Sequence, residues 1–126
     1  MTRQTDEHAI ACDAAALERL RRLGGEPLVR DMVALFLETI PLRLAAAREG
    51  SERGDFAVIK LAARSMKSNC RQLGAYEMRD LAERVERAAS ALELAPVPAL
   101  LDALDSELVR VRQWMRDVGV PRSGGE

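Results

Sequence analysis

The sequence predicts an all-α fold, an antiparallel up-down-up-down four-helix bundle with a short extra N-terminal helix. The chain has 126 residues, the size of one domain, and it is 48% hydrophobic but only 3% aromatic, which favours helix-on-helix packing. Its apolar residues recur at steps of three and four in four long segments. Because the linkers between these segments are short, neighbouring helices must run antiparallel. We therefore expect one domain over residues 13–118, between a flexible N-terminal segment, 1–12, and a flexible tail, 119–126.

Two consecutive glycines separate the first two predicted helices. A short helix is expected over residues 13–23, with an aspartate as its N-cap and Gly24-Gly25 as its end. A long helix then begins near Glu26-Pro27 and continues towards residue 50, with proline in the first turn, where it costs no hydrogen bond. Pro41 lies inside this helix. We expect a kink there rather than a break, because both flanks keep the same apolar stripe.

Three further helices follow at regular intervals. Gly54-Asp55 ends the linker and caps a helix over 56–73, and Gly74 supplies the next turn. The fourth helix is expected over 75–94, stopped by Pro96-Val97-Pro98, and the fifth over 99–118. The inward positions of the four long helices are Val29, Met32, Val33, Phe36, Ile40 and Leu44; Ile59, Ala62, Met66, Cys70 and Leu73; Met78, Leu81, Ala82, Val85, Ala89 and Leu92; and Leu101, Leu104, Leu108, Val111, Met115 and Val118.

The charge balance and the apolar segments limit the location and partners. Nineteen basic and twenty acidic residues give a net charge of -1, which provides no bulk attraction to nucleic acid or to anionic lipid. The longest apolar region, 32–47, contains charged residues and cannot span a bilayer. Residues 1–8 are polar and lack the apolar core of a signal peptide. We expect a soluble cytoplasmic protein, a monomer, with no membrane and no nucleic-acid partner.

The residues that usually carry chemistry are few. Cys12 and Cys70 have no metal-ligand or redox spacing, so free thiols are the simpler interpretation, and Cys70 falls on an apolar stripe. His8 is the one histidine, and no phosphate-binding glycine loop occurs. A metal site needs three or four converging ligands. We therefore predict no metal, no cofactor and no enzymatic activity.

Four cations share one side of the predicted third helix. Lys60, Arg64, Lys67 and Arg71 fall in one sector of a helical wheel, beside the apolar stripe. Like charges at these spacings slightly destabilise an isolated helix. A solvated face that serves solubility is the plainer explanation of such a charge run. The surrounding sequence favours a functional explanation of these four cations.

The segment 63–75 reads Ala-Arg-Ser-Met-Lys-Ser-Asn-Cys-Arg-Gln-Leu-Gly-Ala. It resembles, without a gap, the signature of histidine phosphotransfer (HPt) domains, which reads Ala-His-x-Leu-Lys-Gly/Ser-Ser and ends in Leu-Gly-Ala. The resemblance extends over roughly residues 13–116, through an opening helix that starts at Asp13, a Gly-Gly-Glu-Pro turn, and a second helix with Leu35-Phe36-Leu37-Glu38 and Pro41.

The resemblance implies a phosphorelay module with one altered position. In HPt domains the signature histidine projects into solvent, accepts a phosphoryl group from a kinase or a receiver aspartate, and passes it on. Arg64 occupies that position, and a guanidinium stays protonated and offers only donors, so it cannot replace a nucleophilic imidazole. Lys67 matches the family lysine that neutralises phosphate, and Ser68 matches the small residue beside the histidine. His8 lies in the lead-in and is a poor substitute, since positioning dominates phosphoryl transfer.

We therefore expect a degenerate HPt module that binds the receiver domain of a response regulator, or a sensor kinase, without transferring phosphate. The partner-binding residues would be Lys60, Arg64, Lys67, Ser68 and Arg71. Two alternatives stay open. The chain could be a helical adaptor unrelated to phosphorelays, with its assembly surface on the fourth or fifth helix, or a weak nucleic-acid binder through the basic stripe, although aromatic residues for base stacking are missing there.

Overall fold

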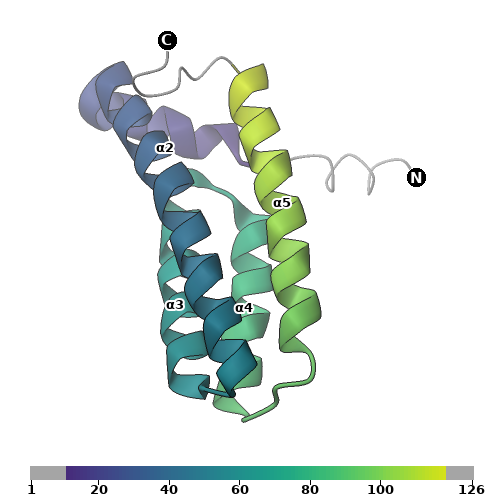
Figure 1. Ribbon diagram of the computed structural model, residues 1–126. Coiled ribbons are helices and arrows are strands. Elements are labelled where there is room, and N and C mark those ends of the chain that lie inside the picture. Colours follow the sequence, from purple (N-terminus) through teal and green to yellow (C-terminus); the bar gives the residue numbers. More distant parts are fainter. Residues whose placement is uncertain (1–10, 119–126) are drawn as a thin grey trace.

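A computed structural model describes residues 11–118 of the chain (Figure 1). Four long helices stand side by side, each antiparallel to the next along the chain, as the sequence predicts. Helix α3 packs most extensively against α4 and α2, whereas α5 contacts α4 less and α2 least. The α2–α5 seam is therefore the most open side of the bundle. The expected flexible tail and most of the expected lead-in, including His8, lie outside the described residues.

Helix α2 spans Ala14–Arg53, but its backbone changes direction at Gly25. This glycine has φ 73° and ψ -170°, so the first arm crosses the end of the bundle before the long arm runs down its side (Figure 1). The Asp13 carboxylate accepts a hydrogen bond from the Ala15 backbone N–H at 3.0 Å. The predicted short and long helices are thus both present. The long arm continues through Pro41 without non-helical dihedral angles.

Helix α3 spans Phe56–Leu73, with the bounds that its capping residues predict. The Asp55 carboxylate accepts from the Val58 backbone N–H at 3.2 Å, and Gly74 ends the helix with φ 71°, a left-handed conformation that glycine adopts without strain. Caps at both ends determine the register of the helix, and that register decides which side chains reach solvent.

Helices α4, Tyr76–Ser90, and α5, Val97–Asp117, differ from the prediction at their junction. Helix α4 ends four residues before the expected position because Leu92 takes φ 59°, and the backbone N–H of Glu93 bonds to the Ala88 carbonyl at 2.8 Å. The helix therefore stops before the prolines. Pro98 instead lies in the first turn of α5, where a missing N–H leaves no helical bond unmade.

The predicted apolar stripes meet in one core, with a few exceptions. Leu92 and Val118, expected to face inward, are 70% and 45% exposed because they lie beyond the helix ends. Ala11 and Cys12, expected in a flexible lead-in, are instead buried, so the packed domain begins before residue 13. The stripe positions that are fully or almost fully buried are Val29, Val33, Phe36, Ile40, Leu44, Ile59, Ala62, Met66, Cys70, Leu73, Met78, Ala82, Val85, Ala89, Leu101, Leu104, Leu108, Val111 and Met115.

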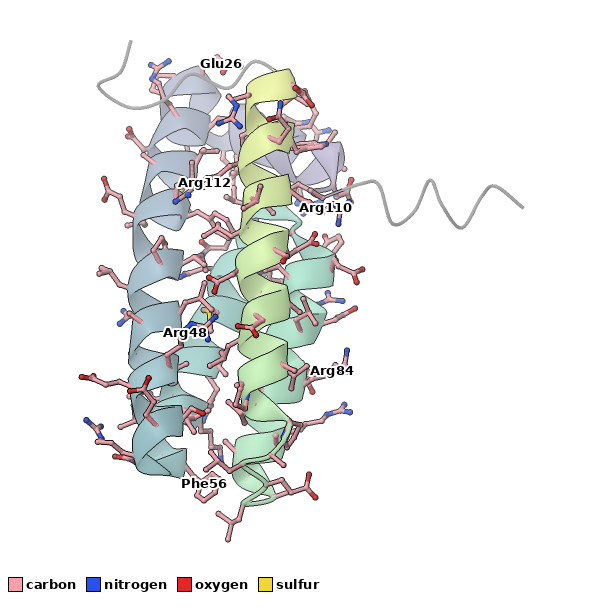
Figure 2. The ribbon with its side chains drawn as sticks, turned by 45° about the vertical axis from the view of Figure 1, so that its right-hand side comes forward. Glu26, Arg48, Phe56, Arg84, Arg110 and Arg112 are labelled. Carbon is pink, nitrogen blue, oxygen red and sulfur yellow. The ribbon has the colours of Figure 1, made fainter. Side chains whose placement is uncertain are left out.

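Polar contacts connect α2 to other parts of the bundle at two places. The Asp13 backbone N–H donates to the Gly74 carbonyl at 2.9 Å, which attaches the first arm of α2 to the α3–α4 turn. Arg48 of α2 points towards α5 (Figure 2), where its guanidinium bonds to Asp102 at 2.9 Å and also to Asp105. Over residues 11–118, no helix combines the length and apolarity needed to cross a membrane.

Candidate partner-binding site on the third helix

Arg64 lies in the middle of α3 and points away from the core. Its side chain is 63% exposed, whereas its neighbours Ala63 and Met66 are fully buried. The Arg64 Nε atom lies 3.5 Å from Glu86 Oε2 of α4, an ion-pair distance that no hydrogen bond accompanies among the described residues. Most of the guanidinium donors therefore face solvent.

Lys67 is only partly exposed, and it is paired with two glutamates of α4. Its Nζ donates hydrogen bonds to Glu83 Oε1 at 2.8 Å and to Glu86 Oε1 at 2.6 Å, and its side chain is only 22% exposed. The hydrogen bond to Glu83, and then that to Glu86, raises the pKa of Lys67, while the hydrogen bond from Lys67 lowers the pKa of Glu83. The ammonium is therefore held in place and largely neutralised by α4.

The other predicted site residues differ in exposure and surroundings. Lys60 is half-buried. Ser68 and Arg71 are exposed and lie towards α2, where they share a hollow of about 470 Å³. That hollow is lined by Arg19, Leu20, Met32, Ser68, Arg71 and Gln72. The structure thus brings Ser68 and Arg71 together in one hollow, which neither Lys60 nor Lys67 lines.

Two further residues lie near this part of α3 and were not among the predicted site residues. Leu61, one turn before Arg64, is 72% exposed, and Arg43 of α2 donates from Nε to Ser65 Oγ at 3.0 Å. Both line a second hollow between α2 and α3, of about 380 Å³. A leucine outside the apolar stripe was the available sequence signal for Leu61. Arg43 had none, because its approach to α3 depends on how the two helices pack.

We use the name α2–α3 face for the exposed surface formed by Arg43, Leu61, Arg64, Ser68 and Arg71. It combines three guanidinium groups with an apolar side chain and a small hydroxyl. The two hollows beside it are shallow places into which a partner's side chains can fit. Such a surface suits non-covalent binding of an acidic partner with some apolar contact.

The chain resembles known proteins in its fold and in its sequence. No curated protein matches. The solved crystal structure of histidine-containing phosphotransfer protein B from Pseudomonas aeruginosa PAO1 is similar to this fold, with a TM-score of 0.80 and 22% sequence identity over 85% of this chain and 92% of that one. The model of the Hpt domain matches residues 31–114, well over half of the sequence. The chain therefore belongs to the Hpt domain family.

Proposed function

We propose that this chain is a phosphorelay module that binds a receiver domain, or a sensor kinase, through the α2–α3 face and does not itself carry phosphate. The observation that carries the proposal is the exposed Arg64 in the middle of α3, at the signature position of the histidine. An arginine offers donors but no lone pair for attack on phosphorus. The module would act by occupying, inhibiting or scaffolding its partner.

Electrostatic complementarity supports a receiver as the partner. Receiver domains expose acidic side chains around their phosphorylatable aspartate, and Arg64 can pair with a carboxylate through two parallel N–H donors. Arg43 and Arg71 extend the positive charge along the same face. Leu61, 72% exposed, adds apolar area that becomes buried on contact. Charge would then accelerate association and apolar burial would slow dissociation.

The contacts of Lys67 also argue against phosphate transfer. The family lysine helps to neutralise the phosphoryl group, but here Glu83 and Glu86 bind its ammonium and add negative charge beside the site. A phosphoryl group at position 64 would have to displace these carboxylates or lie next to them. Both the missing nucleophile and the occupied lysine thus favour a binding role.

A binding titration tests the proposal directly. Candidate receiver domains, with Mg²⁺ present, are titrated against the chain and against Arg64→Glu, and we expect the substitution to weaken binding at least about tenfold. Arg84→Glu is the matched control, because Arg84 projects from α4 on the side away from α2 (Figure 2). Equal losses in both variants would indicate general charge attraction. Binding that neither substitution weakens would indicate an adaptor surface elsewhere.

A second experiment tests the absence of phosphotransfer. The chain is incubated with a phosphorylated receiver, and transfer of phosphate is followed by gel and by mass spectrometry. We expect no transfer to the chain as written. Arg64→His restores an imidazole, and combining it with Glu83→Gln and Glu86→Gln releases Lys67. Transfer that appears only in the combined variant would support the role assigned to the two glutamates, whereas phosphate on the unaltered chain contradicts the proposal.

A further inference from the structure

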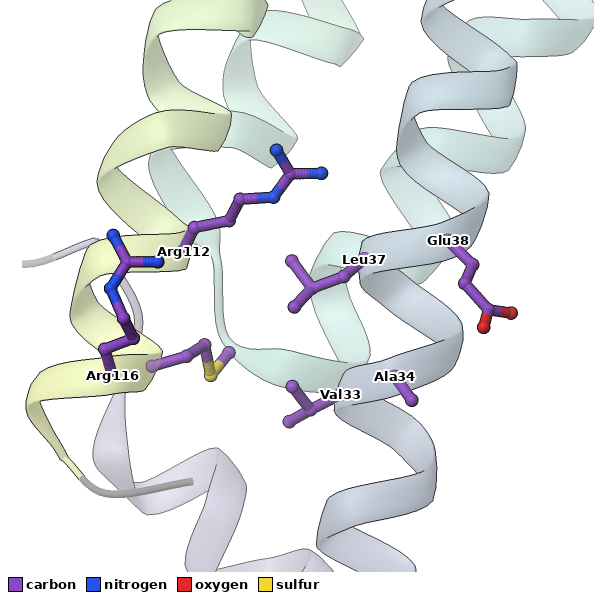
Figure 3. A pocket seen from close by; sticks show the side chains of 7 residues that line it. Val33, Ala34, Leu37, Glu38, Arg112 and Arg116 are labelled. Carbon is purple, nitrogen blue, oxygen red and sulfur yellow. The ribbon is translucent and has the colours of Figure 1, made fainter. Parts of the chain in front are cut away.

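A pocket of about 410 Å³ lies in the α2–α5 seam, on the side of α2 away from α3. Its apolar lining comprises Val33, Ala34 and Leu37 of α2 and Met115 of α5. Figure 3 shows Val33 and Leu37 pointing from α2 towards α5. Its size falls within the range of ligand pockets, roughly 300–1,000 Å³. This is the seam where the two helices contact each other least, so the space is a consequence of how the bundle is packed.

Two guanidinium groups stand at the mouth of this pocket. Arg112 and Arg116 extend from successive turns of α5, and Arg112 reaches into the space between the helices (Figure 3). Within residues 11–118, Arg112 makes no ion pair, and Arg116 donates to the neutral Gln113 at 2.8 Å. Glu38 is the acidic residue of the lining, but its carboxylate points away from the two arginines, to the far side of α2.

We infer that this pocket binds a compact anionic amphiphile, a carboxylate with a short unbranched hydrocarbon chain. The carboxylate would accept hydrogen bonds from Arg112 and Arg116, and the hydrocarbon chain would lie against Val33, Leu37 and Met115. Arginine is suited to this because its fork of donors matches the two oxygens of a carboxylate. The apolar floor supplies burial that a free inorganic anion could not use.

The dimensions of the pocket favour such a molecule over a docked partner helix. The lining residues cover positions 33–38 on α2 and 112–116 on α5, roughly 6–8 Å of helix axis. A helix that docks in a groove needs anchors from i to i+7, which extend over about 10.5 Å. The inference is independent of the α2–α3 face, so either can fail alone.

A methyl NMR titration with octanoate tests the inference. We expect saturable shifts of the Val33, Leu37 and Met115 methyl signals. We also expect at least about tenfold weaker binding by octanol, which keeps the chain but lacks the carboxylate, and by the double variant Arg112→Gln/Arg116→Gln. Arg84→Gln should bind like the unaltered chain. Ala34→Phe, which keeps both arginines but fills the pocket, should also abolish the shifts, and circular dichroism confirms that each variant is folded.

Several outcomes would overturn the inference. They are shifts that do not saturate, shifts that centre on the α2–α3 face, equal binding of octanol and octanoate, and octanoate affinity that survives both the arginine and the Ala34 substitutions. An acidic amphipathic peptide that saturates the same methyl signals while octanoate fails would assign the pocket to a protein partner instead.

Discussion

Lys67 and Glu86 face each other across the α3–α4 interface, with Nζ 2.6 Å from Oε1. The second oxygen of the same carboxylate lies 3.5 Å from Arg64 Nε. One glutamate of α4 thus binds Lys67 closely and leaves most donors of Arg64 free. Arg64 and Lys67, three residues apart on one helix, therefore differ in how freely they can bind a partner.

The ion pairs of Lys67 should make stability depend on pH. Lys67→Met keeps an apolar stem but removes the charge, and at pH about 7 it should be less stable than the unaltered chain. The lowered pKa of Glu83 means that its contribution is present above its ordinary pKa and is lost as the pH falls through the folded value. The raised pKa of Lys67 means that its contribution is lost only as the pH rises through its folded value.

Urea denaturation at pH about 7 and about 3 measures this effect, and the difference between the two chains should shrink in acid. Lys60→Met is the control, since Lys60 makes no ion pair among residues 11–118. A stability difference for Lys67→Met that is the same at both pH values would contradict the assigned ion pairs.

Truncation of two apolar residues on α3 should affect two different properties, the stability of the fold and the binding of a receiver. Ile59 is fully buried and Leu61 is 72% exposed. Ile59→Ala should lower the free energy of unfolding by about 2–5 kcal/mol, because it leaves a cavity in the core. Leu61→Ala should change it by no more than about 0.5 kcal/mol, and should instead weaken receiver binding. Chemical denaturation and the receiver titration together separate the two roles. A large loss of stability for Leu61→Ala would show that the Leu61 side chain is buried in solution.

Two helix-ending glycines should differ in their tolerance of a methyl group. Gly54 and Gly74 both have positive φ, 68° and 71°, so alanine costs about 1–2 kcal/mol at either position. A Cβ at Gly74 would also lie 2.9 Å from the Cβ atoms of Asp13 and Ala16, whereas one at Gly54 meets nothing within 4 Å.

Thermal unfolding should therefore show a larger loss for Gly74→Ala than for Gly54→Ala. The extra loss reports the contact between the first arm of α2 and the α3–α4 turn, where the Asp13 N–H bonds to the Gly74 carbonyl. Equal losses in the two variants would mean that the first arm does not pack there in solution.

The two thiols should be inert in the folded protein. Cys12 and Cys70 are 2% and 0% exposed, and burial raises the pKa of each to about 12. Relative to their ordinary value of 9.0, this lowers the thiolate fraction at neutral pH roughly a thousandfold. N-ethylmaleimide should add to neither cysteine until denaturant is present, after which mass spectrometry should show two additions. Rapid addition to Cys12 alone would show that the segment before residue 13 is mobile.

Most of the helical plan could be predicted from local chemistry. The caps at Asp55 and Gly74 place α3 in its observed register, because N-caps and left-handed glycines act within one turn of the chain. Leu92 was wrongly predicted to lie inside α4. It follows the end of this helix with a positive φ, a conformation that local propensity disfavours for residues other than glycine. The burial of Cys12 was not predicted, because it depends on contact with helices distant in sequence.

What the sequence by itself determined is the all-α bundle, the register of α3 and the permanent charge of Arg64. These follow from periodicity, capping and the chemistry of one side chain, all of which act locally. Only the tertiary structure decided that Glu83 and Glu86 bind Lys67, that Arg43 bonds to Ser65 and lines one hollow with Leu61, and that α2 and α5 leave a pocket between them. Those relationships depend on distances between helices, which are set by how large side chains interlock across the whole core.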